Sequence, residues 1–149
     1  MTNSRTKLAL ALALGMGSPL LAADTAGTVQ VYKSPSCGCC TDWVKHLEDN
    51  GFEVTVTEMN NLTQVKTRAG LSPALASCHT AFVDGYVIEG HVPASDIRRL
   101  ITQSPDALGL TVPGMPAGSP GMEMGNVRDH YQVLMFNRRG QTRVFAEYN

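Results

Sequence analysis

Three cysteines, Cys37, Cys39 and Cys40, fall within four positions, between a predicted strand and a predicted helix. The strand is residues 28–32, TVQVY, whose alternation and β-branched side chains are typical of strands, and Pro35 ends it. Apolar residues at i, i+3, i+4 and i+7 from Cys40 predict a helix that begins near residues 38–40. Because a helix N-terminus favours anions, it lowers thiol pKa values and supplies thiolates. The cluster is therefore predicted to be chemically active.

The spacing of these cysteines fits two kinds of chemistry. Cys37 and Cys40 form a Cys-x-x-Cys pair, typical of thiol–disulfide exchange, whereas Cys37 and Cys39 form a Cys-x-Cys pair, typical of metal binding. We expect Gly38 to let the backbone bend tightly between the first two sulfurs. A third sulfur would interfere with a disulfide catalyst, whereas it strengthens a site for Cu(I), Zn(II) or an iron–sulfur cluster. The spacing favours a soft metal, with a thiol–disulfide oxidoreductase using Cys37 and Cys40 as the alternative.

The rest of the chain predicts the element order β-α-β-α-β-β-α, which is that of a thioredoxin-like α/β domain. After the first strand and helix, the predicted elements are a strand at 52–59, a helix at 62–69 capped by Asn61, strands at 80–83 and 86–89 joined by Asp84–Gly85, and a helix from Pro93 or Ala94. In that fold, the loop entering the third strand faces the N-terminus of the first helix. Cys78 precedes this strand, so it is expected to meet the other three cysteines.

Two structural interpretations of the four cysteines stay open. One is a pair of disulfides, such as Cys37–Cys40 with Cys39–Cys78. The other is structural zinc, although Cys-x-Cys-Cys matches the usual Cys-x₂₋₄-Cys spacing poorly.

The segment at 105–126 is rich in Gly, Pro and Met and predicts a long loop, which is followed by a hairpin at 131–147. Met115, Met122 and Met124 are soft thioethers, so the loop is a candidate lid or delivery segment for a metal, or else it simply packs on the surface. His79 and His91 are further candidate ligands or orienting groups, although strand alternation would turn His79 away from Cys78. His46 falls on the polar face of the first helix and is expected to be solvated.

Residues 1–23 have the pattern of a secretory signal peptide, with Arg5 and Lys7 before an apolar run and small residues before a cleavage site after Ala23. An uncleaved membrane anchor is the less favoured alternative, because the run is too short to span a bilayer comfortably. Cleavage would change the formal net charge from −1 to −3. We expect a soluble exported domain, residues 24–149, in the periplasm if the source is Gram-negative. Without a basic run, nucleic-acid binding has no electrostatic support.

Three motifs together resemble one known family. Residues 34–40, SPSCGCC, are followed by a helix with a Trp, then by SCHTAFVDGYVIEGHVP, and then by GLTVPGMPAGSPGMEMG. From Val29 to the C-terminal hairpin, the chain resembles the CopG-type periplasmic copper-resistance proteins of bacteria.

The resemblance implies a thioredoxin-like fold and a cysteine-bridged cluster of several copper ions. By position, the cluster cysteines are Cys37, Cys39, Cys40 and Cys78. It also implies a role in copper resistance, with interconversion of Cu(I) and Cu(II) as one form that this role could take. The partners implied are copper ions and other periplasmic copper-handling proteins. The sequence itself offers no candidate membrane span after the signal peptide, so we expect no membrane association once that segment is removed.

Overall fold

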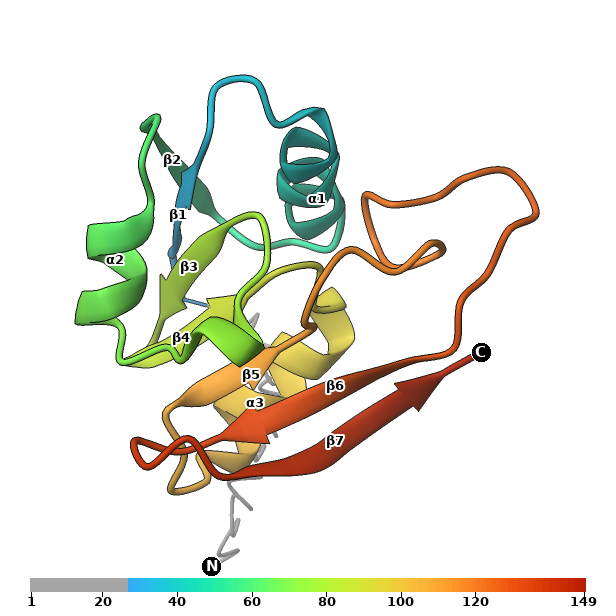
Figure 1. Cartoon of the computed structure of the whole chain (residues 1–149). Coiled ribbons are helices and arrows are strands. Elements are labelled where there is room, and N and C mark those ends of the chain that lie inside the picture. The colour runs from blue at the N-terminus through green and yellow to red at the C-terminus, as the bar shows by residue number, and fades with distance from the viewer. Residues whose placement is uncertain (1–26) are drawn as a thin grey trace, which may run out of the picture.

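The structure is a computed structural model that describes residues 27–149 (Figure 1). The elements are β1 (Val29–Lys33), α1 (Gly38–Asp49), β2 (Val54–Glu58), α2 (Thr63–Arg68), the 3₁₀-helix η1 (Pro73–Leu75), β3 (Thr80–Val83), β4 (Tyr86–Glu89), α3 (Ala94–Gln103), β5 (Gly109–Thr111), β6 (Tyr131–Phe136) and β7 (Thr142–Tyr148). The predicted signal peptide, residues 1–23, lies outside the described residues. Among residues 27–149, no helix combines the length and apolar character needed to cross a membrane.

All seven strands form one mixed sheet in the order β2-β1-β3-β4-β5-β6-β7. β1 pairs in parallel with β2 and antiparallel with β3, and β4 pairs in parallel with β5. The elements up to α3 follow the predicted order β-α-β-α-β-β-α, with η1 added. The mixed α/β class and the C-terminal hairpin, β6–β7, are thereby confirmed. The order is compatible with a thioredoxin-like domain, which stays a prediction.

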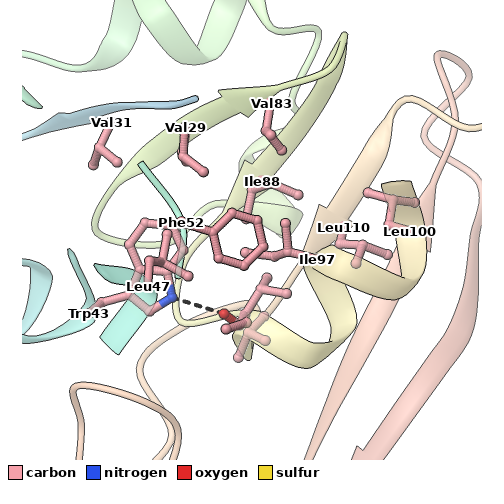
Figure 2. Close-up of a cluster of buried hydrophobic side chains, with 14 of the residues drawn as sticks. Val29, Val31, Trp43, Leu47, Phe52, Val83, Ile88, Ile97, Leu100 and Leu110 are labelled. Carbon is pink, nitrogen blue, oxygen red and sulfur yellow. Dashed lines mark hydrogen bonds between the residues drawn. The ribbon is translucent and has the colours of Figure 1, made fainter. Parts of the chain in front are cut away.

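The two faces of the sheet carry separate apolar clusters. The larger one joins α1 and α3 to the sheet and includes Trp43, Leu47, Ile88, Ile97 and Leu100, all fully buried (Figure 2). The smaller one lies under α2 and η1. Its buried members are Ala69, Leu71, Leu75, Val87 and Phe136. Helices therefore cover both faces of the sheet, and the end of β1, the start of β3 and the end of β4 lie beside one another at the same edge of the sheet.

Helix α1 is oriented by the apolar positions that predicted it. Its buried residues are Cys40, Trp43, Val44 and Leu47, as the i, i+3, i+4, i+7 spacing indicates. Burying a side chain such as that of Leu47 contributes about 1.5–3 kcal/mol. The indole Nε1–H of Trp43 donates a hydrogen bond of 2.9 Å to the carbonyl oxygen of Val92, which Figure 2 draws as a dashed line. This bond links α1 to the segment between β4 and α3.

Strand β5 was not predicted, because residues 109–111 lie within the segment expected to be a loop. Three residues are too few to show a period, and β5 is fixed instead by pairing with β4 on one side and β6 on the other. A Cβ atom at Gly109 would come within 1.8 Å of the carbonyl oxygen of Val87, so the close approach of the two strands requires glycine there.

Candidate metal centre

The turn between β1 and α1 places Cys37, Cys39 and Cys40 at the N-terminus of α1. The N–H of Cys37 donates to the carbonyl oxygen of Ser34 at 3.1 Å, which closes the turn just before the helix. Cys40 faces the core and is fully buried, whereas Cys37 and Cys39 are half-buried. The three cysteines therefore lie within the first turn of the helix, as predicted.

Gly38 does not play the part expected from the sequence. It is the first residue of α1, its φ is not in the left-handed region, and a Cβ atom there would meet nothing within 4 Å. The sulfurs of Cys37 and Cys39 are brought together by the start of the helix itself, so glycine is not required between them.

Cys37 and Cys40 form a disulfide, while Cys39 and Cys78 are free thiols. The sulfur of Cys39 lies 3.5 Å from that of Cys37. Of the two disulfides considered as a structural alternative, the first is therefore present and the second is not. Four thiolates become available at this site only when the Cys37–Cys40 bond is reduced.

Cys78 reaches the same point from the segment between η1 and β3. The sulfur atoms of Cys37, Cys39, Cys40 and Cys78 all lie within 4.8 Å of one another, which is close enough to hold a metal ion. The pKa of the Cys78 thiol is raised to about 11, mainly by burial, with a smaller lowering contribution from the Ser77 hydrogen bond and a smaller raising one from the neighbouring Cys39. In the metal-free protein, Cys78 is thus a protonated thiol at neutral pH.

Two buried histidines contact Cys78. The sulfur lies 3.1 Å from Nε2 of His91 and 3.3 Å from Nδ1 of His79. Nδ1 of His91 lies 2.8 Å from the carbonyl oxygen of Pro120, which can only accept, so Nδ1 carries the proton and Nε2 is free to accept from the thiol. Burial lowers the pKa of both imidazoles, that of His79 well below its ordinary value. Neutral imidazoles of this kind suit metal binding.

His79 lies on the same side as Cys78, in contrast to the expectation from strand alternation. It precedes the first residue of β3, so the two-residue period does not yet apply to it. Its ring packs against that of Trp43 with centroids 4.3 Å apart, and its Nε2 is buried without a hydrogen-bond partner among residues 27–149. Cys78, His79 and His91 form a second group whose ligand atoms lie within 4.8 Å of one another.

The loop after β5 crosses the N-terminal turn of α1. A Cβ atom at Gly121 would come within 2.7 Å of the carbonyl oxygen of Cys39 and within 2.7 Å of the backbone nitrogen of Trp43. Met122 follows this crossing and is half-buried, whereas Met115 and Met124 are 54% and 59% exposed. Of the three candidate methionines, Met122 therefore lies next to the point where the loop touches the cysteine helix.

Two polar residues near the site were not recognised in the sequence. His46 is half-buried rather than solvated, and its Nε2 accepts the N–H of Ala94 at the start of α3. Glu89, in β4, is fully buried and accepts the backbone N–H of Ser77, next to Cys78. Glu89 is the last residue of the strand sequence YVIE, a position where a charged side chain is ordinarily exposed. The sequence therefore carries little signal that this carboxylate is buried.

The chain was compared with known families and structures. A family model described as "Protein of unknown function, DUF411" matches residues 75–122. Two solved structures, named copper resistance protein CopG form 1 and form 2, are 50% and 48% identical, with TM-scores of 0.78 and 0.79. Each match covers 83% of this chain and 98% or 99% of the CopG chain. The search of curated proteins returned no match. At this identity and coverage, the chain belongs to the family of the copper resistance protein CopG.

Proposed function

We propose that this protein binds copper through Cys37, Cys39, Cys40 and Cys78 and serves copper resistance in the periplasm. The names of its solved relatives support a copper-related role. The observation that carries the proposal is the convergence of one distant and three local sulfur atoms within 4.8 Å. Thiolates are soft ligands and select Cu(I) over the harder cations of the same compartment.

Charge balance favours several copper ions over one divalent ion. Four thiolates gather four negative charges in a partly buried site, which costs free energy unless cations offset them. One Zn²⁺ would neutralise only half of this charge. Several Cu(I) ions bridged by the same sulfurs bring the site close to neutrality, so we propose a cysteine-bridged cluster.

The Cys37–Cys40 disulfide connects copper binding to redox chemistry. Its reduction breaks one S–S bond, takes up two electrons and gives two thiolates. Two Cu(I) ions supply these electrons by each becoming Cu(II), and the reverse reaction reoxidises the cysteines. This couple accounts for interconversion of Cu(I) and Cu(II), whereas storage of Cu(I) on all four sulfurs needs the disulfide reduced by another thiol.

Export is the second part of the proposal. Residues 1–23 act as a cleaved signal peptide, and the mature chain works in the periplasm with other copper-handling proteins. Protein purified from periplasmic extracts and sequenced from its N-terminus should begin close to residue 24. An N-terminus that retains residues 1–23 would contradict this part of the proposal.

Anaerobic titration of the reduced mature protein with Cu(I), against a chromophoric Cu(I) chelator, tests the copper site. We expect more than one Cu(I) per chain, and a loss of both stoichiometry and affinity in Cys78→Ser. Ser36→Ala is a matched control, because it changes an exposed side chain in the same turn as the cysteines. A stoichiometry of one or fewer that Cys78→Ser leaves unchanged would contradict the four-sulfur site.

One observation favours a second candidate function, thiol–disulfide exchange. The Cys37–Cys40 disulfide lies at a helix N-terminus with Cys37 half-exposed and Cys40 buried, so one sulfur is open to attack. The test is reduction of insulin by the protein in the presence of dithiothreitol. Turnover that survives both Cys39→Ser and Cys78→Ser would favour this function over copper binding.

A further inference from the structure

Cys78 lies outside the sheet, in the segment between η1 and β3, so the strand ladder alone does not fix it. The carbonyl oxygen of His79 accepts the N–H of Gly90 at 3.1 Å, which extends the β3–β4 pairing by one bond. On the other side of Cys78, the N–H of Ser77 has no strand partner. Its partner is Oε1 of Glu89, at 2.6 Å.

The Glu89 carboxylate makes three bonds in a fully buried position. Besides Ser77, it accepts the hydroxyl of Thr80 on Oε2 at 2.7 Å and forms an ion pair with the ammonium of Lys66. The Lys66 ammonium also donates to Thr80 at 3.0 Å. Burial raises the pKa of this carboxyl, whereas Lys66 and the hydrogen bonds from Ser77 and Thr80 lower it. The bonds to Ser77 and Thr80 lie on either side of Cys78 in the sequence.

This network approaches Cys78 from the face of the sheet opposite to the metal centre. Thr80 and Glu89 are paired residues of β3 and β4, and Lys66 comes from α2. The neighbouring residues Ala81 and Ile88 belong to the cluster under α1, with Trp43. Glu89 therefore acts on the Cys78 backbone without touching any of the four sulfurs.

We propose that Glu89 is a positioning residue that holds Cys78 against the cysteines of α1. This inference rests on the proposed function, since it assigns a purpose to the placement of Cys78. Glu89 holds the Ser77 N–H on one side of the cysteine and the Thr80 hydroxyl on the other, and Lys66 orients the carboxylate. Loss of the carboxylate frees the Ser77 N–H and lets the segment and its thiol move away from the site.

Thiol reactivity tests this inference without copper. In metal-free Cys39→Ser protein with the Cys37–Cys40 disulfide intact, Cys78 is the only free thiol of the mature chain. Its rate of reaction with Ellman's reagent reports how firmly the segment is held. We expect Glu89→Ala to raise this rate several-fold and Glu89→Gln to raise it less, because the amide oxygen of Gln still accepts from Ser77.

Asp96→Ala is the control that separates positioning from stability, and Lys66→Met tests the ion pair that orients Glu89. Lys66→Met removes the ion-pair partner but leaves the Ser77 acceptor in place. Asp96→Ala removes another buried carboxylate, on α3, which accepts hydrogen bonds from Tyr148 of β7 and from Arg99 of α3. Both should lower the melting temperature, yet leave the Cys78 reaction slower than in Glu89→Ala. If Asp96→Ala lowers the melting temperature as much as Glu89→Ala and Cys78 reacts with Ellman's reagent equally fast in both, the inference is overturned.

Copper affinity in the otherwise native reduced protein gives the second readout. Residues that orient metal ligands typically change affinity by about 10–100-fold, so we expect Glu89→Ala to weaken Cu(I) binding by at least about tenfold. Asp96→Ala should bind Cu(I) as the unmodified chain does. If Glu89→Ala exposes the thiol while neither it nor Cys78→Ser changes copper binding, the positioning role stands and the proposed copper site fails. An unchanged thiol rate in Glu89→Ala would overturn the positioning role itself.

Discussion

The two sources of sulfur in this site are held in different ways. Cys37, Cys39 and Cys40 lie in one turn at the start of α1, and their mutual distances follow from their spacing and from the helix. Cys78 comes from a distant segment whose place depends on the β3–β4 ladder, on Glu89 and on the loop after β5. Ser77 also donates its hydroxyl to the carbonyl oxygen of Gly114 in that loop.

The difference means that the two halves of the site should respond to different changes. A substitution far from the four sulfurs can displace Cys78 and leave the other three cysteines in place. Displacing Cys37, Cys39 and Cys40 while Cys78 stays in place is harder, because α1 is anchored by buried residues along its whole apolar face. A change that disturbs both halves together should therefore have the largest effect.

Trp43→Ala should have the largest effect, because Trp43 joins the two halves. Its fully buried indole packs on His79 and donates to Val92. Removing a buried aromatic side chain costs about 3–5 kcal/mol of the free energy of unfolding. Urea denaturation of the metal-free protein measures the loss, with Trp43→Phe as the milder variant. A cost below that of an exposed substitution would show that α1 does not depend on this contact.

Gly90→Ala should disturb the Cys78 half of the site and not the α1 half. Gly38→Ala, in the α1 half, is the matched control. Gly90 has a φ of +72°, and an added Cβ would come within 2.6 Å of the Ser77 side chain and of the Val112 carbonyl oxygen. We expect a loss of at least about 2 kcal/mol, from the left-handed backbone and the overpacking together. Gly38 has open space around it, so Gly38→Ala should change stability by less than about 0.5 kcal/mol. Equal losses in urea denaturation would contradict the contrast.

The pH dependence of Cys78 should distinguish it from an ordinary exposed thiol. Burial raises its pKa from 9.0 to about 11 in the folded protein. The stability gained by keeping this thiol protonated is present below pH 9 and is lost as the pH rises from about 9 toward 11, because only the unfolded chain has then released the proton. Alkylation of metal-free protein, followed by mass spectrometry, should show Cys78 reacting with a midpoint above 9. A midpoint below 9 would indicate a solvated thiol.

Met115→Leu and Met124→Leu should have the smallest effects. Both side chains are more than half exposed, so each change should alter the free energy of unfolding by less than about 0.5 kcal/mol and leave the copper stoichiometry unchanged. The same copper titration on Met122→Leu tests the methionine beside the loop crossing. A larger loss of copper stoichiometry in Met115→Leu than in Met122→Leu would show that Met115, and not Met122, lies against the site when copper binds.

The sequence predicted those parts of the molecule that local patterns determine. The apolar face of α1 and the Asp84–Gly85 turn are present. Asn61 accepts the Thr63 N–H at 2.9 Å, but the N-cap of α2 is Leu62, one residue later than predicted. The arrival of Cys78 beside α1 followed from an analogy of fold and not from any local signal. Strand β5 and the buried carboxylate of Glu89 were missed, because both depend on partners distant in the chain.

Copper K-edge X-ray absorption on the reduced mature protein loaded with Cu(I) tests the central proposal most directly. A cluster bridged by Cys37, Cys39, Cys40 and Cys78 predicts sulfur-dominated coordination with copper–copper scattering, and loss of that scattering in Cys78→Ser. A spectrum without copper–copper scattering, dominated by nitrogen or oxygen ligands and identical in Cys78→Ser, would contradict it.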